Sequence, residues 1–183
     1  MLTSKLEIKG LLVLEPKVFI DDRGYFYEAW NKELFDKNGI DFIPVQQNES
    51  SSKYGVIRGL HYQLNPFSQA KVVRVILGEV LDVAVDLRQN SSTYGKHFSI
   101  LLTAENKKQF YIPKGFAHGF SVLSDFAVFS YLCDEYYNPE YERSIIYNDK
   151  SLNIDWKIPE DKEIVSGKDR KGKSLIEAEN NFK

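Results

Sequence analysis

Short apolar segments recur along the chain and alternate with turn-forming connectors. The clearest connectors are Gly78-Glu79, residues 90–95 and Pro113-Lys114-Gly115. Many short strands separated by such turns predict an all-β sandwich or barrel. The expected strands are Leu11–Leu14, Gly24–Trp30, Val56–Gln63, Val72–Leu77, Val80–Leu87, Phe98–Leu102, Gln109–Ile112, Phe116–Leu123 and Phe126–Cys133.

Few helices are expected between these strands. Residues 31–38 can form one, because Asn31 suits an N-cap, Glu33 would lie in the first turn and Gly39 follows the last residue. A further short turn is expected near residue 142 or residue 151.

The last thirty residues are more polar than the rest of the chain and include Pro159, Gly167 and the charged run 168–173. Such runs are typical of solvated tails or linkers. We therefore expect a single domain over residues 1–183, with a polar extension (about 151–183) that packs back on the barrel.

The segment Val56–Gln63 places Arg58 and His61 inside a run that otherwise predicts a buried strand. Strict alternation would put these two side chains on opposite faces. Gly59 lies between them, and a glycine inside a strand often marks a β-bulge, which would bring both side chains to the interior face. The alternative is a solvated arginine and a hydrogen-bonded core histidine.

Composition narrows the class of protein. The 183 residues are 43% apolar and 27% charged with a net charge of -2, which argues against disorder and against nucleic acid as a partner. The single cysteine, Cys133, excludes an intramolecular disulfide and fits a small core hydrophobe in a reducing compartment. No apolar run suggests a signal peptide or a membrane span, so we expect a soluble cytoplasmic protein.

The chain has three histidines, His61, His97 and His118, which limits metal sites. A metal-binding β-barrel usually gathers two or three histidines with a carboxylate, whereas here Gln63 stands where a second ligand would share a face with His61. His97 would begin a strand at an exposed edge. No metal is therefore expected.

Three further side chains are candidates for chemistry, each with a structural alternative. His118 lies among small residues that allow a close approach, although a core histidine bonded to a carbonyl is an equal explanation. Tyr131 lies on a strand, where a tyrosine is more often a packed aromatic side chain than a catalytic acid. Lys71 opens the strand Val72–Leu77, where a lysine is normally solvated.

Two more segments suggest binding. In residues 21–28 a turn at Asp22 and Gly24 is followed by alternating aromatic and charged residues, which could grip a planar ring and a phosphate. Gln46, Gln47 and Asn48 form an amide cluster that could bond a sugar or base, although a polar loop is the commoner explanation.

Taken together, several runs of residues resemble the dTDP-4-dehydrorhamnose 3,5-epimerase family, whose members are cofactor-independent sugar-nucleotide epimerases with a cupin-like jelly-roll fold. They occur in the family's order over nearly the whole chain. The matching runs are residues 22–26 (DRGYF), 45–50 (VQQNES), 57–63 (IRGLHYQ), 112–120 (IPKGFAHGF) and 168–170 (KDR).

The resemblance implies an isomerase that removes the protons at C3 and C5, next to the C4 ketone of a dTDP-linked 6-deoxyhexose, and returns them on the opposite face. His61 matches the family's base, and Asp169 matches the carboxylate that orients the imidazole. Tyr131 matches the acid and Lys71 matches the cation near the enolate. No cofactor is implied.

The resemblance also implies a binding site for the nucleotide sugar. The matching positions are Arg23, Phe26, Glu28, Gln46, Asn48, Arg58 and His118, with Phe19 and Tyr136 as further candidates for gripping the base. Members are homodimers that exchange N-terminal strands, so Arg23 and its neighbours would serve the partner's pocket.

Two alternatives remain at this point. Relatives with the same fold and base act at C3 alone or isomerise the keto sugar, so a 3-epimerase or ketoisomerase is the first alternative. A non-catalytic sugar-binding cupin is the second, although it would have no need of a polarised acid–base set. Tyr131 favours the double epimerase, because inversion needs a proton donor on the face opposite His61.

Overall fold

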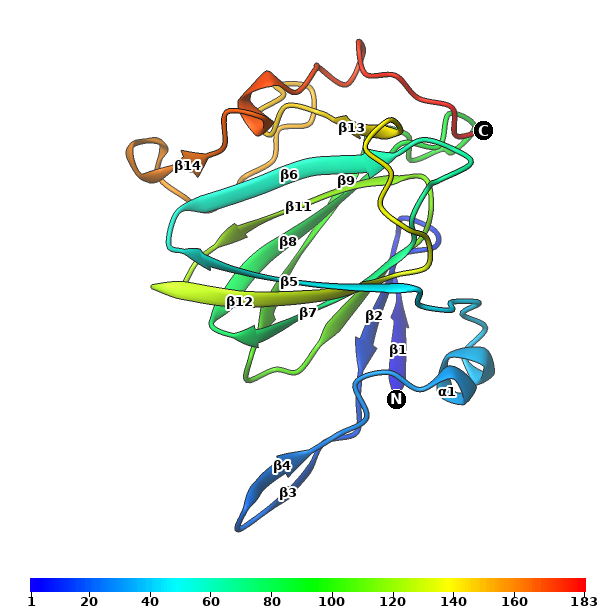
Figure 1. Cartoon of the computed structure of the whole chain (residues 1–183), viewed down its shortest axis with the longest axis vertical. Helices are drawn as coiled ribbons and strands as arrows, with labels where there is room; N and C mark the ends of the chain where they lie inside the picture. The colour runs from blue at the N-terminus through cyan, green and yellow to red at the C-terminus, as the bar shows by residue number, and fades with distance from the viewer.

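The computed structural model describes residues 1 and 3–183. Two antiparallel sheets face each other as a sandwich (Figure 1). The first sheet has the order β1 (Leu2–Lys5), β2 (Leu12–Glu15), β10 (Gln109–Ile112), β7 (Lys71–Leu77), β12 (Phe126–Cys133) and β5 (Gln46–Lys53). The second has the order β13 (Glu142–Ser144), β6 (Val56–Gln63), β11 (Phe116–Val122), β8 (Glu79–Asp86) and β9 (His97–Thr103), and β14 (Ile164–Val165) pairs with β6.

The predicted all-β sandwich is confirmed, and most expected strands form within a residue or two of their predicted bounds. These strands could be predicted from the sequence because side chains that face inward alternate with side chains that face outward. On β8, for example, Val80 and Ala84 point into the core between the sheets, whereas Leu81, Val83 and Val85 belong to a second apolar layer on the other face.

Other predicted elements were wrong. The expected strand Gly24–Trp30 shortens to β4 (Gly24–Phe26), which pairs with β3 (Phe19–Asp21) in a hairpin that projects from the sandwich (Figure 1). Residues 46–48 belong to the strand β5, not to a loop. They escaped prediction because β5 carries polar residues on both faces. Glu142 begins a strand, and the short turn expected near residue 142 or residue 151 forms at residues 150–152.

The predicted helix is confirmed as α1 (Lys32–Lys37). The Asn31 side chain accepts a hydrogen bond from the backbone N–H of Leu34, and Gly39 follows with a φ of +73°. Phe35 buries the helix against the outer face of the first sheet, where it packs beside Phe42. This contact fixes one end of the segment that leads from the hairpin to β5.

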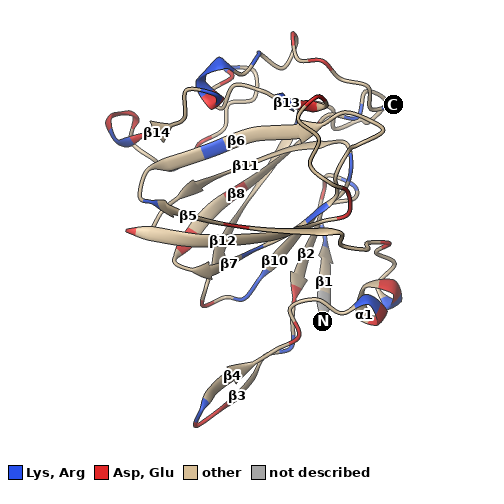
Figure 2. Cartoon of the chain, viewed as in Figure 1, with Lys and Arg blue, Asp and Glu red and all other residues tan. Residues whose placement is uncertain are grey.

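The C-terminal segment runs over the outer face of the second sheet (Figure 1). It includes the short helices η1 (Glu160–Lys162) and η2 (Asp169–Lys171) and ends with Phe182, which is 5% exposed and packs on Tyr62. Charged residues gather on this segment and on the loops, whereas the strands carry few (Figure 2). These contacts support our proposal that residues 1–183 form one domain.

Within residues 1 and 3–183, no helix has both the length and the apolar character needed to span a membrane.

Candidate active site

A cavity of about 530 Å³ opens between the second sheet, the inner face of β12 and the C-terminal segment. The strands β6, β7, β11 and β12 supply Arg58, His61, Lys71, His118 and Tyr131, and β14 and η2 close one side. Its lining residues are Ser50, Val56, Ile57, Arg58, His61, Lys71, His118, Gly119, Phe120, Phe129, Tyr131, Ile164, Val165, Ser166, Lys168 and Asp169. The side chains predicted to do chemistry therefore meet in one place.

A β-bulge in β6 brings Arg58 and His61 into this cavity together. In the pairing with β11, His118 stands opposite His61 and Phe120 stands opposite Arg58, so β6 contains one residue more than β11 over this stretch. Gly59 has a φ of +129°, which only glycine adopts readily. The predicted bulge is confirmed, and both side chains line the cavity. Arg58 is nevertheless exposed and His61 is hydrogen-bonded, as the alternative expected.

His61 forms a short ionic hydrogen bond with Asp169. Its Nε2–H donates to Asp169 Oδ1 at 2.7 Å, and the Asp169 side chain is only 5% exposed. Burial raises the pKa of Asp169, but hydrogen bonds from His61 and Ser166 and from the Gly59 backbone outweigh it, so the pKa is lowered overall. Asp169 is therefore an anion at neutral pH and holds the imidazole in one orientation.

A second histidine–carboxylate pair lies deeper in the cavity. His118 Nε2 lies 2.9 Å from Asp82 Oδ2, and both side chains are buried. The His118 ring also stacks on Phe129, with the centroids 6.1 Å apart. The structure combines the two explanations that the sequence left open. His118 lines the cavity, and it is also hydrogen-bonded, but to a carboxylate and not to a carbonyl.

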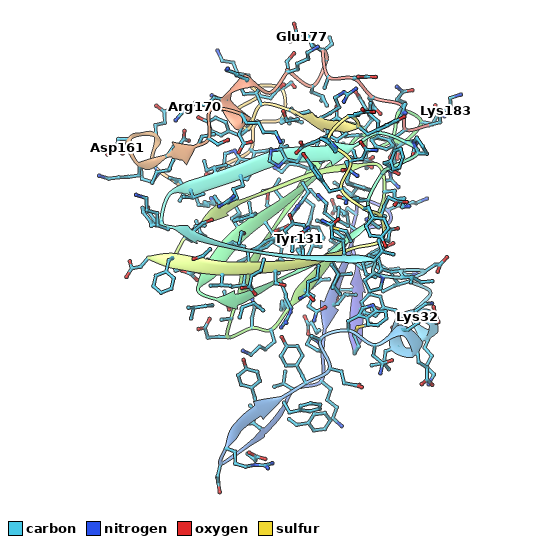
Figure 3. The ribbon with its side chains drawn as sticks, in the orientation of Figure 1. Lys32, Tyr131, Asp161, Arg170, Glu177 and Lys183 are labelled. Carbon is cyan, nitrogen blue, oxygen red and sulfur yellow. The ribbon has the colours of Figure 1, made fainter. Side chains whose placement is uncertain are left out.

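Tyr131 points into the space between the sheets (Figure 3), and the Lys71 ammonium lies 5.9 Å from the centre of its ring. Burial raises the pKa of Tyr131, although a hydrogen bond with Asn48 and the charge of Arg58 oppose it. Burial lowers the pKa of Lys71, and the nearby acid Asp82 opposes that shift. Tyr131 therefore keeps its proton at neutral pH and stands beside an amine of weakened basicity.

A smaller polar chamber of about 110 Å³ adjoins the cavity and shares His61, Lys71 and Tyr131 with it. Its other lining residues are Gln46, Asn48, Tyr62, Gln63, Gln69, Tyr137 and Glu142. Gln46 and Asn48 enter the chamber because alternate residues of β5 face inward, and Asn48 stands directly opposite Tyr131 in the pairing with β12. Two of the predicted binding residues thus lie next to the predicted acid.

Glu142 organises the far side of this chamber. Its Oε2 accepts hydrogen bonds from the Tyr137 hydroxyl at 2.7 Å and from Lys168 Nζ at 2.6 Å. Burial raises the pKa of Glu142, but these two bonds and the charges of Lys168 and His61 outweigh it and lower the pKa overall. A carboxylate therefore faces the same space as the imidazole and the phenol.

The structure places the other predicted binding residues away from this chain's own cavity. Phe19 and Phe26 lie on the projecting hairpin and are 51% and 67% exposed. Arg23 lies at the hairpin's turn, paired with Asp21, and Glu28 follows the hairpin and accepts a bond from Asn31. Tyr136 is 62% exposed on the loop after β12, and its neighbour Tyr137 lines the chamber instead.

Sequence reasoning missed Asp82, Glu142, Lys168 and Ser50, which also line the cavity or hold a lining residue. Asp82 could have been found, because an acid inside the apolar run 80–87 is an unusual residue for a buried strand. Lys168 adjoins Asp169 in a run already singled out. Glu142 and Ser50 carry no comparable signal in the sequence.

Among the described residues, no group of three or more His, Cys, Asp and Glu side chains is arranged to hold a metal ion. His97 begins the edge strand β9 as expected, but it is half-buried, because the loop around Leu152 covers it. Cys133 is buried as predicted, and burial raises the pKa of its thiol to about 11.

A β-sandwich whose inner cavity holds a carboxylate-bonded imidazole, a protonated phenol and a buried amine defines a cupin-like acid–base enzyme. Residues 5–177 match the family model described as dTDP-4-dehydrorhamnose 3,5-epimerase. The chain therefore belongs to the dTDP-4-dehydrorhamnose 3,5-epimerase family and is an isomerase.

Individual relatives agree with this assignment. The chain is 48% identical over 178 residues to dTDP-4-dehydrorhamnose 3,5-epimerase of Shigella flexneri, covering 96% of each chain. It is similar to the crystal structure of the enzyme of that name from Elizabethkingia anophelis, with 50% identity, 99% of both chains covered and a TM-score of 0.93. A Legionella pneumophila epimerase in complex with dTDP-4-keto-L-rhamnose is 47% identical, covers 96% of this chain and 93% of its own, and gives a TM-score of 0.92.

Proposed function

We propose that this enzyme epimerises C3 and C5 of dTDP-4-dehydro-6-deoxy-D-glucose and forms dTDP-4-dehydro-L-rhamnose, in the biosynthesis of dTDP-L-rhamnose. One observation carries the proposal: the bonded pair His61–Asp169 and the phenol of Tyr131 line the same cavity, with the Lys71 amine beside the phenol. The names of the relatives support the substrate. A single cysteine and the nature of the substrate favour the cytoplasm.

His61 acts as the general base. Because its Nε2–H is given to Asp169, the neutral imidazole presents its other nitrogen, Nδ1, as the proton acceptor. The anion of Asp169 stabilises the imidazolium that forms when a proton leaves C3 or C5. The carbonyl at C4 makes those protons acidic, so the chemistry needs no cofactor to activate the carbon.

Proton removal leaves an enolate whose charge lies on the C4 oxygen. Lys71 and Arg58 line the cavity and can donate hydrogen bonds to that oxygen. Tyr131 then returns a proton to the opposite face of the carbon. Its raised pKa keeps it protonated until the carbanion requires the proton.

Deuterium exchange tests this reaction. The purified enzyme is incubated with dTDP-4-keto-6-deoxyglucose in deuterated water, and incorporation at C3 and C5 is followed by NMR. Incorporation at both carbons with inversion is expected. Incorporation at C3 alone would identify a single epimerase, and nucleotide binding without exchange would identify a binding protein or an enzyme for another sugar.

We also propose a homodimer in which the β3–β4 hairpin of one chain completes the cavity of its partner. The hairpin projects from its own sandwich with exposed aromatic side chains, among them Phe19 and Phe26. β5 is the edge strand of its sheet and flanks the chamber, so its open edge can accept a further strand. Arg23 would then reach the nucleotide of the partner's site.

Mixing two inactive variants tests this arrangement. Arg23→Ala and His61→Ala proteins are denatured together and refolded. If the hairpin is exchanged, each mixed dimer has one intact site, and random mixing restores about a quarter of the wild-type activity. If each site is built from one chain, mixing restores none. Gel filtration of the wild type measures the dimer directly.

A further inference from the structure

The loop after β12 carries two tyrosines at the edge of the smaller chamber. Tyr137 lines the chamber, and Tyr136 is one of the residues expected to grip the base. The two side chains are 52% and 62% exposed, so packing of the rings against the protein does little to hold them in place. The backbone of the loop therefore determines where the two rings lie.

Gln63 binds this loop by its backbone. Its Nε2 donates to the Tyr136 carbonyl oxygen at 3.1 Å and to the Phe67 carbonyl oxygen at 2.6 Å, and its Oε1 accepts from the Asn138 N–H at 2.7 Å. The side chain is 5% exposed and belongs to the last residue of β6, two residues after His61. Because its amide donates to two carbonyl groups of the protein, Gln63 acts on a ligand through the loop and not by donating to it.

Two more glutamines bind neighbouring backbone groups of the loop. Gln46 Oε1, from β5, accepts from the Tyr137 N–H at 2.9 Å. Gln69 Nε2, from the loop before β7, donates to the Glu135 carbonyl oxygen at 2.8 Å. Together with Gln63 they hold one backbone group in each of four consecutive residues, and all three line the chamber. We call these three side chains the glutamine clamp.

A neutral amide suits this task. Each amide offers both donors and an acceptor, so it can bind the carbonyl and N–H groups of a backbone without bringing a charge to the site. A buried backbone group left without such a partner costs free energy comparable to a lost hydrogen bond. A carboxylate in the same place would accept but not donate, and its charge would repel a diphosphate.

We propose that the glutamine clamp holds the loop so that Tyr136 and Tyr137 flank the nucleotide, with Gln63 as the central positioning residue. A loop that is already ordered lowers the entropic cost of binding the nucleotide between the rings. The clamp supplies no group to the sugar, so it governs the affinity for the nucleotide and leaves the proton transfers unchanged. The inference rests on the proposed function, which takes Gln46 and Asn48 as nucleotide-binding positions.

Gln63→Met tests the clamp, because methionine keeps the length of the side chain and removes the amide. The Kd for dTDP, measured by isothermal titration calorimetry, should rise at least about tenfold. Deuterium exchange into saturating substrate should stay within about twofold of the wild-type rate, since the catalytic side chains are retained. Hydrogen exchange of the backbone amides of residues 134–141, followed by mass spectrometry, should become faster, because the Asn138 N–H loses its acceptor.

Two further variants separate positioning from folding. Gln69→Met removes a less buried member of the clamp, so it tests the same proposal if Gln63→Met does not fold, and its Kd for dTDP should rise about threefold. Ser121→Ala is the matched control. The Ser121 hydroxyl is buried and donates to the Trp156 carbonyl oxygen at 2.7 Å, outside the chamber. This variant should lose stability to urea but keep the wild-type Kd for dTDP.

A wild-type Kd for dTDP in both Gln63→Met and Gln69→Met would overturn the clamp. A fall in the exchange rate at saturating substrate as large as the rise in Kd would show that Gln63 only supports β6 and His61, and it would overturn the clamp as well. If the wild type itself did not bind dTDP, the proposed function would be overturned instead.

Discussion

Gly59 and Gly119 face each other across β6 and β11 with no room for a side chain between them. A Cβ atom on Gly59 would lie 2.6 Å from the Gly119 Cα, and one on Gly119 would lie 2.6 Å from the Arg58 carbonyl oxygen. This close approach forms the bulge that turns Arg58 and His61 to the same cavity. Backbone packing in this place therefore determines the geometry of the base.

Gly59→Ala should destabilise the enzyme and displace the base. The added methyl group would meet backbone atoms, which cannot move aside as a side chain can, and the φ of +129° is unfavourable for alanine. We expect a loss of about 1–3 kcal/mol in the free energy of unfolding, measured by urea denaturation. Gly167→Ala is the control, because a Cβ there would meet no atom within 4 Å. Equal stability of the two variants would contradict this account.

Asp169→Asn should lower kcat, but less than His61→Ala does. The amide can no longer balance the charge of the imidazolium, whereas loss of the imidazole removes the base itself. We expect a loss of about 10-fold to 100-fold for Asp169→Asn and of about 10²-fold to 10⁴-fold for His61→Ala. Initial rates of epimerisation measure both. Asp155→Asn, an exposed acid of the C-terminal segment, is the control, and substantial turnover by folded His61→Ala would show that another group is the base.

Tyr131→Phe should separate proton removal from proton return. His61 remains, so the substrate protons still exchange with deuterated water, but the donor on the opposite face is lost. We expect deuterium to enter C3 or C5 with little inversion, which NMR of the sugar resolves. Tyr111→Phe is a matched control, since Tyr111 lies on the outer face of the same sheet. Inversion at the wild-type rate would assign the acid to another residue.

Asp86→Asn should reduce stability and remove part of its dependence on pH. Burial raises the pKa of Asp86, but hydrogen bonds from Arg88, Thr93 and Ser91 outweigh it and lower the pKa to about 2. Because the pKa in the folded protein lies below the ordinary aspartate value of 3.8, the stabilisation is fully present above about pH 4 and is lost as the pH falls through 2.

The shift corresponds to about 2 kcal/mol of stability at neutral pH. Urea denaturation of the wild type and of Asp86→Asn between pH 2 and pH 7 measures it. The two curves should converge at the acid end of that range. A difference in stability that is the same at every pH would assign the effect to packing and not to ionisation.

The sequence by itself determined the class of fold. Strands such as β10 and β12 are rich in apolar residues because nearly all of their side chains are buried or partly buried, so their bounds could be predicted exactly as they occur. The N-cap at Asn31 could also be predicted, because its hydrogen bond is made within its own helix. Gly59 also carried a local signal, because a glycine between two polar residues of a buried strand indicates a bulge.

Only the tertiary structure decided which distant residues meet. Asp169 lies 108 positions after His61, inside a charged run that is polar enough to be a free tail, and its burial against the imidazole comes from the path of the C-terminal segment. The strand β5 is polar on both faces, and one of them lines the small polar chamber. Its sequence therefore shows no alternation of apolar and polar residues. Glu142 likewise has no local signal. Local patterns record which face of an element is buried, whereas an acid–base set depends on contacts between segments far apart in the chain.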